Sequence, residues 1–417
     1  MNPSIKYIDL FAGAGGLSEG FIRAGFTPVA HVEMDLAACY TLKTRLVYHY
    51  LKSHKQSDIY LEYLKGKISR PELYSHIPAE LLESVINLSI SSENNETIFN
   101  LVTKQLKNSE VDLIIGGPPC QAYSLVGRAR SADRMESDPR NHLYIQYASF
   151  LEKFKPKLFL FENVLGLKSA KDGSYLANME KLYFQKGYKM KLYTLAANNF
   201  GVLQNRRRII ILGWRKDINP DLPDLEAIRV PSEFNVNCIF NDLPQINAGQ
   251  GVDKFSNYRS KTNEYLDQKL IRNGLDILTQ HIARPHSDQD KEIYRIAVNK
   301  WDKKGQRLDY NDLPETLKTH KNRHSFFDRF KVVAQDLNCS QTVVAHIAKD
   351  GHYYIHPDIN QNRSISVREA ARLQSFPDNY YFEGVKEGQN RTAAFKQIGN
   401  AVPPLMAYII AKELIIL

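Results

Sequence analysis

A glycine-rich turn near the start of the chain restricts the fold more than any other feature of the sequence. The residues FAGAGG (11–16) follow a short apolar run at 5–10, whose composition favours a strand. They precede apolar residues at helical spacing over 17–24, and a second strand is expected at 28–32. A strand, a glycine turn, a helix and a second strand form the opening unit of an α/β domain.

Further short apolar runs continue this alternation of strands and helices. They are VDLII, KLFLF and RIIIL, at residues 111–115, 157–161 and 208–212. Their continuous apolar character is typical of buried parallel strands, so we expect a doubly wound α/β domain. The polar, helix-like segment 51–110 interrupts the alternation and is interpreted as an insertion between early strands. Towards the end of the chain, an apolar helix is expected at 397–413.

The chain becomes loop-rich after Trp214, which predicts a second, smaller domain. We expect the α/β domain over residues 1–225, completed by residues 386–417, and the smaller domain over 226–385. The chain has 55 Lys+Arg against 46 Asp+Glu, a formal net charge of +9, and residues 291–331 hold eleven Lys/Arg against six Asp/Glu. This excess fits a polyanionic partner, although such a run is also typical of a solvated face.

Cysteine usage argues against a disulfide framework and against a structural zinc site. The four cysteines, Cys39, Cys120, Cys238 and Cys339, lie far apart and form no C-x-x-C pair. The N-terminus has no signal segment, and the most apolar stretches fall short of the ~20 residues that cross a membrane. We therefore expect a cytoplasmic protein without a metal ion.

The glycine turn is suited to a nucleotide ligand, because small residues before a helix let a ligand approach the backbone N–H groups. Glu33 lies twenty residues beyond Gly13, at the end of the second expected strand, where a carboxylate can accept both ribose hydroxyls of an adenosine. Ser18 stands where the dinucleotide fingerprint has its third glycine. These residues alone leave open a nicotinamide enzyme, a methyltransferase, or a tight turn with no ligand.

Cys120 has the surroundings of a functional thiol. It lies in GGPPCQAYS, directly after the expected strand 111–115, where open α/β sheets place their ligands. Two prolines and two glycines shape the backbone here, whereas a buried structural cysteine needs neither. A nucleophilic role requires a neighbour that stabilises the thiolate. The other three cysteines lack such a context and are interpreted as structural.

Six segments in order, DLFAGAGGLSEGF, GGPPCQAYS, ENV, QNRRRIIILG, REAARLQSFPD and QIGNAVPP, resemble the motif set of cytosine-5 DNA methyltransferases, and above all that of bacterial modification enzymes. The resemblance covers somewhat under half of the chain and brackets the rest. It implies an S-adenosylmethionine-dependent, Rossmann-like catalytic domain and a smaller, loop-rich target recognition domain.

The resemblance also implies a mechanism and its residues. In the family, the cysteine that matches Cys120 attacks C6 of cytosine, which makes C5 nucleophilic enough to take a methyl group. Charge then develops towards N3 and O2, so a carboxyl group and guanidinium groups should stabilise the intermediate. Glu162 of ENV matches the first role, and Arg206 and Arg208 match the second. No side chain is evident as the base that removes the C5 proton, and a water molecule is the expected one.

The cofactor implied by the resemblance is S-adenosylmethionine. The matching positions are Phe11, Gly13, Gly15, Gly16, Leu17, Glu33, Met34, Pro119 and Asn400. The acidic residue that usually contacts the adenine amine has no clean match, and Ser89 with Ile90, or Asp58 with Ile59, are the candidates. A second departure is Leu203, where the family usually has a proline.

The implied partner is double-stranded DNA, from which the target cytosine rotates out of the stack. The loop after Cys120 resembles the mobile loop of the family, and the basic residues of the smaller domain can neutralise phosphates. Candidate DNA-binding residues are Gln121, Ser124, Arg128, Arg130, Gln204, Lys303, Lys304 and Arg307.

The sequence therefore predicts a DNA (cytosine-5-)-methyltransferase that acts through a covalent Cys120–C6 adduct. We expect a monomeric bacterial modification enzyme, associated with the nucleoid and paired with a restriction endonuclease for the same site. An RNA cytosine methyltransferase and a non-catalytic DNA-binding relative are the alternatives. A nicotinamide oxidoreductase would explain none of the later motifs.

Overall fold

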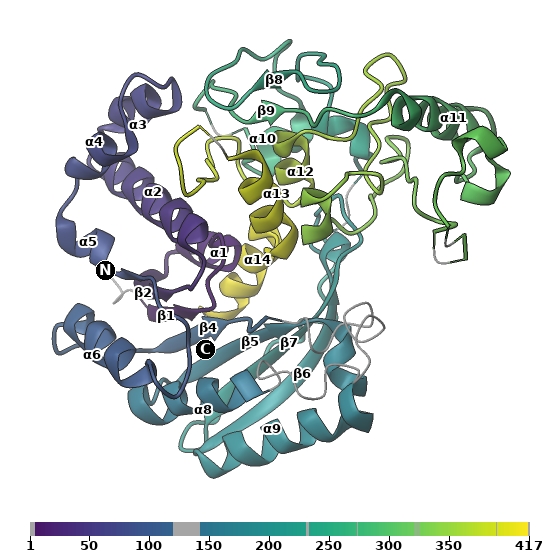
Figure 1. Ribbon diagram of the computed structural model, residues 1–417. Coiled ribbons are helices and arrows are strands. Elements are labelled where there is room, and N and C mark those ends of the chain that lie inside the picture. Colours follow the sequence, from purple (N-terminus) through teal and green to yellow (C-terminus); the bar gives the residue numbers. More distant parts are fainter. Residues whose placement is uncertain are drawn as a thin grey trace.

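A seven-stranded sheet forms the centre of the larger part of the molecule (Figure 1). The computed structural model describes residues 5–119, 142–230, 233–272, 274–321, 323–324, 326–388 and 390–415. The strand order is β3-β2-β1-β4-β5-β7-β6. The strands are β1 (Lys6–Leu10), β2 (Thr27–Val32), β3 (Val85–Ile86), β4 (Leu113–Gly116), β5 (Leu158–Asn163), β6 (Tyr188–Ala196) and β7 (Arg207–Arg215).

Four of the strands predicted from the sequence are confirmed as parallel members of this sheet, namely β1, β2, β4 and β5. The prediction that residues 208–212 form a parallel strand was wrong. They lie in β7, which runs antiparallel to both β5 and β6. The reason is the connection: β7 follows β6 after only the short segment 197–206, whereas a parallel neighbour needs a longer crossover, usually a helix.

Helices cover both faces of the sheet, which makes it a doubly wound α/β structure. On one face, α1 (Gly16–Arg23) and α14 (Pro404–Leu414) pack over strand residues such as Tyr7 and Leu160. The other face is covered by α6 (Asn95–Leu106), α8 (Leu143–Phe154) and α9 (Ser174–Gln185). Both faces are therefore apolar, as the continuous apolar runs predicted.

The segment 51–110 contributes to the sheet. It begins inside α2 (Leu36–Ser53) and continues as α3 (Ser57–Leu64), α4 (Arg70–Ser75) and α5 (Ala79–Glu83). It then supplies the edge strand β3 and the covering helix α6. Only α3, α4 and α5 stand outside the strand–helix alternation of the sheet.

Residues 226–385 have little regular structure. Their elements are α10 (Glu264–Gln268), α11 (Asp288–Lys304), α12 (Val367–Leu373), the short pair β8 (Gly251–Val252) and β9 (His281–Ile282), and several 3₁₀ turns. Buried arginines replace the missing backbone ladders. Arg372, fully buried, binds Asp242 and Asp378 at 2.6 Å each, and Arg368 binds the Thr279 and Tyr380 carbonyls. These bonds hold the loops of this part around its apolar core.

The end of the chain differs from the single helix expected at 397–413. Helix α13 (Arg391–Asn400) ends at Asn400, and α14 begins at Pro404. Pro403 and Pro404 have no N–H group to donate, so one continuous helix cannot pass through them. In the part of the chain that the structure describes, no helix is long and apolar enough to cross a membrane.

Candidate functional site

The predicted cofactor and catalytic residues gather at one edge of the sheet. The parallel strands β1, β2, β4 and β5 end there, and each is followed by one of the motifs: FAGAGG, Glu33, the GGPP turn and ENV. Ligands of open α/β sheets bind at this carboxyl edge, close to where the strand order reverses. In this sheet the reversal falls between β1 and β4, the strands that lead into FAGAGG and GGPP.

The FAGAGG turn adopts left-handed backbone conformations that its glycines make accessible. Gly13 has φ +54° and Gly15 has φ +77°, and Phe11 also has a positive φ. Gly16 is required for a different reason, because a Cβ atom there would lie 2.3 Å from the Val402 carbonyl oxygen. The turn is thus tight and packs directly against the connection between α13 and α14.

Glu33 joins the end of β2 to the glycine turn. Its carboxylate accepts the N–H of Gly13 and the N–H of Asp35, both at 2.8 Å. Burial raises the pKa of Glu33, although the two N–H donors oppose this shift. Each carboxylate oxygen keeps a lone pair for a further donor, which suits the ribose role predicted from the sequence.

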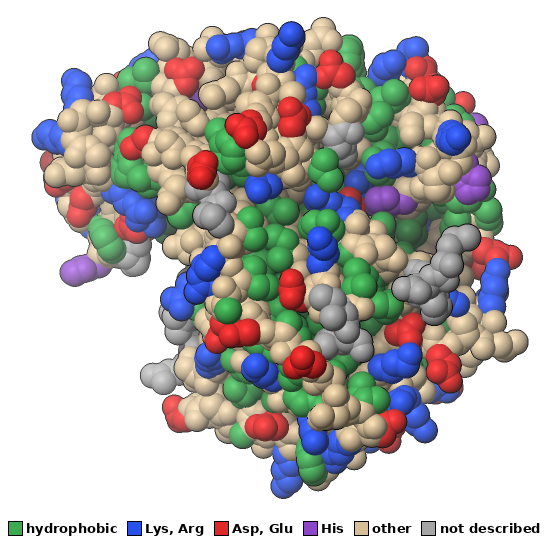
Figure 2. All heavy atoms as spheres, turned by 180° about the vertical axis from the view of Figure 1, so that it is seen from behind, with side chains coloured by type: hydrophobic (Ala, Val, Ile, Leu, Met, Phe, Trp, Pro, Cys, Tyr) green, Lys and Arg blue, Asp and Glu red, His purple; other side chains and the backbone are tan. Residues whose placement is uncertain are grey.

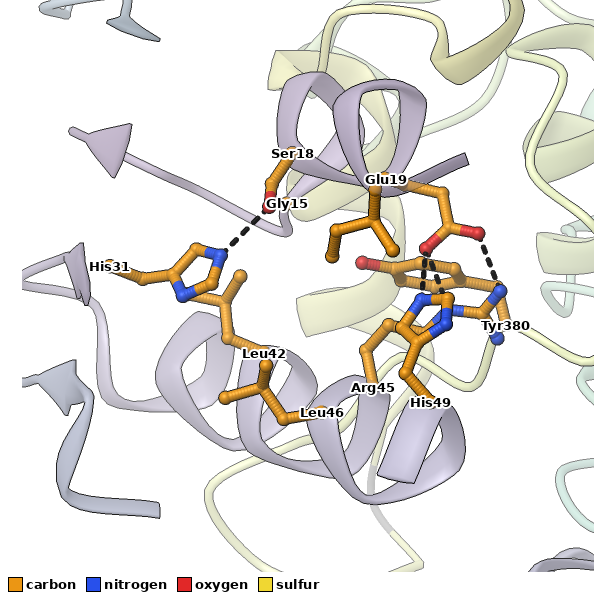
Figure 3. Close-up of a pocket in the computed structure, with 10 residues that line it drawn as sticks. Gly15, Ser18, Glu19, His31, Leu42, Arg45, Leu46, His49 and Tyr380 are labelled. Carbon is orange, nitrogen blue, oxygen red and sulfur yellow. Dashed lines mark hydrogen bonds and ion pairs between the residues drawn. The ribbon is translucent and has the colours of Figure 1, made fainter. Parts of the chain in front are cut away.

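The underside of the turn is held by a polar network around a small cavity beneath α1 (Figure 3). Ser18, which stands in place of the third fingerprint glycine, binds Nε2 of His31 at 2.8 Å and the hydroxyl of Tyr7 at 2.5 Å. The Tyr380 hydroxyl donates to the Ala14 carbonyl, so the smaller part of the molecule also braces the turn. The departure at Ser18 therefore serves packing. The Leu17 side chain is buried in the core under α1.

Asn87 fills a gap that sequence reasoning left at the adenine side. It directly follows β3 and donates to the carbonyls of Glu33 (3.1 Å) and Met34 (3.0 Å). Met34 itself is 67% exposed. Of the earlier candidates, Ser89 is bonded to Asn94 and Asp58 lies on α3. The signal was the two-residue strand β3 before Asn87, which is too short to recognise by periodicity.

Two of the predicted catalytic residues meet. The Nε of Arg208 lies 2.7 Å from Oε1 of Glu162, and both side chains are largely buried. Glu162 is on β5 and Arg208 on the neighbouring antiparallel β7, where the register sets them diagonally opposite. A Cβ atom on Gly117 would lie 2.5 Å from Oε2 of Glu162, so the GGPP turn runs against this carboxylate.

The GGPP turn leads from β4 towards Cys120. The side-chain amide of Asn163 in ENV donates to the Pro118 carbonyl at 3.3 Å, and Pro119 is exposed beside it. The predicted nucleophile Cys120 lies outside the described residues. The same holds for the DNA-binding candidates Gln121, Ser124, Arg128 and Arg130.

Gln204 and Arg206 are placed differently from their predicted roles at DNA and substrate. Both are fully buried. The Gln204 amide donates to the Leu373 carbonyl and accepts from the Val343 N–H, while Arg206 donates to the Val343 and Gly399 carbonyls. Their bonds favour a supporting role over direct contact with a ligand.

The far end of the chain returns to the site, as the motif order predicted. Asn400 is exposed at the last position of α13. Two residues later, the Val402 carbonyl packs against Gly16 of the glycine turn. The structure thus brings Asn400 close to FAGAGG although nearly 390 residues separate them in sequence.

The basic candidates Lys303, Lys304 and Arg307 are all exposed at and just after the end of α11. Among the residues described, none of the three has an acidic partner within ion-pair distance. Figure 2 shows the molecule from behind, with lysine and arginine side chains spread among acidic ones and a notch between the two parts. Overall charge therefore does not mark one DNA-binding face in this view.

Comparison with known proteins gives a consistent result. The family model of the C-5 cytosine-specific DNA methylases matches residues 5–73 and 83–416. The type II methyltransferase M.Bpa9945I of Bacillus paralicheniformis is 43% identical, over 97% of this chain and 97% of its own. M.DdeI of Desulfomicrobium norvegicum is 30% identical, over 98% of this chain and 88% of its own.

Solved structures confirm the predicted fold. An E. coli prophage protein described as a DNA modification methyltransferase has a TM-score of 0.64 at 23% identity and covers 99% of each chain. The methyltransferase EhMeth of Entamoeba histolytica has a TM-score of 0.54 at 15% identity, covering 100% of this chain and 98% of its own.

Proposed function

The chain belongs to the C-5 cytosine-specific DNA methylase family, and on that premise we propose how this DNA methyltransferase of the restriction–modification type works. It transfers a methyl group from S-adenosylmethionine to C5 of a cytosine rotated out of a specific duplex sequence. The observation that carries the proposal is the Glu162–Arg208 ion pair at the carboxyl edge of the sheet, beside the turn that leads to Cys120. A carboxyl group and a guanidinium so placed can hold the polar edge of a pyrimidine.

The chemistry assigns one role to each of three residues. The thiolate of Cys120 forms a bond to C6, and the electron pair of the C5–C6 double bond makes C5 nucleophilic. Glu162 stabilises the charge that develops at N3, and Arg208 stabilises the charge at O2. After methylation a water molecule takes the C5 proton, the double bond reforms, and the Cys120 thiolate leaves.

The donor set at the sheet edge fits S-adenosylmethionine, which supplies an electrophilic methyl group when bound. The left-handed turn at Gly13 and Gly15 opens backbone N–H groups to a ligand at the start of α1. The Glu33 carboxylate holds the ribose hydroxyls. Met34 and Asn87 lie at the adenine side, and Asn400 closes the site from α13.

Duplex DNA binds with the target base extruded, because the edge of a stacked cytosine is out of reach. Lys303, Lys304 and Arg307 neutralise phosphates without reading sequence. The protein acts as a monomer in the bacterial cytoplasm, on chromosomal DNA of the nucleoid, and protects sites that a cognate endonuclease would cut.

Bisulfite sequencing of DNA from cells that express the protein tests this function and reveals the target. We expect one methylated sequence with the wild-type protein and none with Cys120→Ser, which keeps the fold but lacks the thiolate. The same treatment of cellular RNA is the control for the polymer. Methylation by Cys120→Ser, or methylation of RNA alone, would overturn the proposal.

A further inference from the structure

Three consecutive arginines in the QNRRR segment have three different environments. Arg206 is fully buried, Arg207 is exposed, and Arg208 forms the ion pair with Glu162. Only Arg208 is therefore placed to touch a substrate at the sheet edge. The burial of Arg206, two residues earlier on the approach to β7, requires a separate explanation.

Arg206 joins two segments that are far apart in the sequence. Its Nη1 donates to the Val343 carbonyl at 2.7 Å, and its Nη2 donates to the Gly399 carbonyl at 3.2 Å. Gln204 holds the same residue from the other side, because its Oε1 accepts the N–H of Val343 at 2.9 Å. Both backbone groups of Val343 are thus fixed by the QNRRR segment.

The two segments also meet each other directly at this point. The Asn205 N–H donates to the Ser340 carbonyl, so residues 340–343 run beside QNRRR. A Cβ atom on Gly399 would lie 2.2 Å from the backbone nitrogen of Ala345, which shows how closely α13 packs there. On the outer side of this junction, Val344 is 41% exposed.

We infer that Arg206 is a positioning residue that sets both substrate sites relative to Arg208. Its bond to Val343 fixes the exposed backbone around Val344 in the DNA-facing part, and its bond to Gly399 fixes Asn400 at the cofactor. This inference rests on the proposed function. It departs from the expectation that Arg206 itself contacts the cytosine.

The test compares steady-state kinetics of Arg206→Lys with the wild-type enzyme and with Arg207→Ala, the exposed neighbour. A lysine keeps the charge but cannot span two carbonyls, so we expect KM to rise for both DNA and S-adenosylmethionine. Hydrogen bonds from a charged group correspond to about a 10- to 100-fold change in an equilibrium constant, which sets the size expected. Arg207→Ala should leave KM for S-adenosylmethionine unchanged.

The pattern separates positioning from two other roles. A variant that only folds poorly loses active molecules, which lowers kcat and leaves both KM values unchanged. An arginine that touches the cytosine would also lower kcat, with KM for S-adenosylmethionine unaffected. Either result would overturn the inference. A wild-type protein without methylation activity would instead remove the proposed function on which it rests.

Discussion

Gly16 offers a direct test of whether the C-terminal segment helps to build the cofactor site. In Gly16→Ala the new Cβ atom would lie 2.3 Å from the Val402 carbonyl oxygen, about 1 Å short of the ordinary contact range that begins at 3.4 Å. That oxygen belongs to the backbone, so the connection between α13 and α14 has to move. Asn400 lies two residues earlier and should move with it.

Two effects of different size follow from this displacement. Overpacking a buried contact costs about 1–3 kcal/mol of unfolding free energy. A misplacement of about 1 Å in a substrate-positioning group can cost up to ~10²-fold in function. We therefore expect a modest loss of stability together with a much larger loss of affinity for S-adenosylhomocysteine, the cofactor product, measured by titration calorimetry.

Gly20→Ala is the matched control on the same helix. Its Cβ atom would lie 2.4 Å from the Cβ of Ala407 on α14, so the same pair of helices is overpacked one turn further on. Stability should fall by a similar or smaller amount, since alanine favours a helix interior by ~1 kcal/mol. Affinity for S-adenosylhomocysteine should stay near the wild-type value. Equal loss in both variants, or none in Gly16→Ala, would refute the reasoning.

Two further predictions concern catalysis and DNA binding. Arg208→Ala removes a donor to the developing charge and should slow single-turnover methylation by ~10²–10³-fold, and Glu162→Gln should slow it while DNA affinity changes little. Rapid methylation by either variant would contradict their assigned roles. Replacing Lys303, Lys304 and Arg307 by Ala should make the slope of log affinity against log salt shallower, by up to ~0.9 per lost phosphate contact. An unchanged slope in a salt titration would return these residues to an ordinary solvated surface.

The first half of the fold could be predicted because its signals are local. The glycine turn between strand and helix and the continuous apolar runs specify β1, α1, β2, β4 and β5 within short windows of sequence. The direction of β7 could not be predicted, because an apolar run looks the same in a parallel or an antiparallel strand. Its direction depends on the length of the connection from β6.

The candidate site shows the same division. Glu33 and Glu162 were predicted because each ends an apolar run at the same edge of the sheet. The burial of Arg206 beside the exposed Arg207 was not predictable, since nothing within QNRRR distinguishes them. It is decided by residues 340–343, which lie more than a hundred positions later and supply the carbonyl that Arg206 binds.

His31 should make stability depend on pH, and the sign follows from its burial. It lies on β2, and Ser18 faces it from α1, while His49 on α2 adds a positive charge in the same cavity (Figure 3). Burial, and to a lesser degree His49, lowers the pKa of His31 from 6.5 to about 4. Between these values the unfolded chain binds a proton that the folded chain does not, so folding stability falls as the pH is lowered.

The full effect is about 3 kcal/mol at pH 4 relative to neutral pH, and it vanishes above pH 6.5. His31→Gln removes the titrating group and should reduce the pH dependence of the unfolding free energy, measured by urea unfolding between pH 4.5 and 6.5. His54→Gln, on the exposed end of α2, is the control and should change the dependence little. An identical pH dependence in His31→Gln and wild type would show that His31 takes up its proton in the folded protein, and that the network beneath the glycine turn admits a charge.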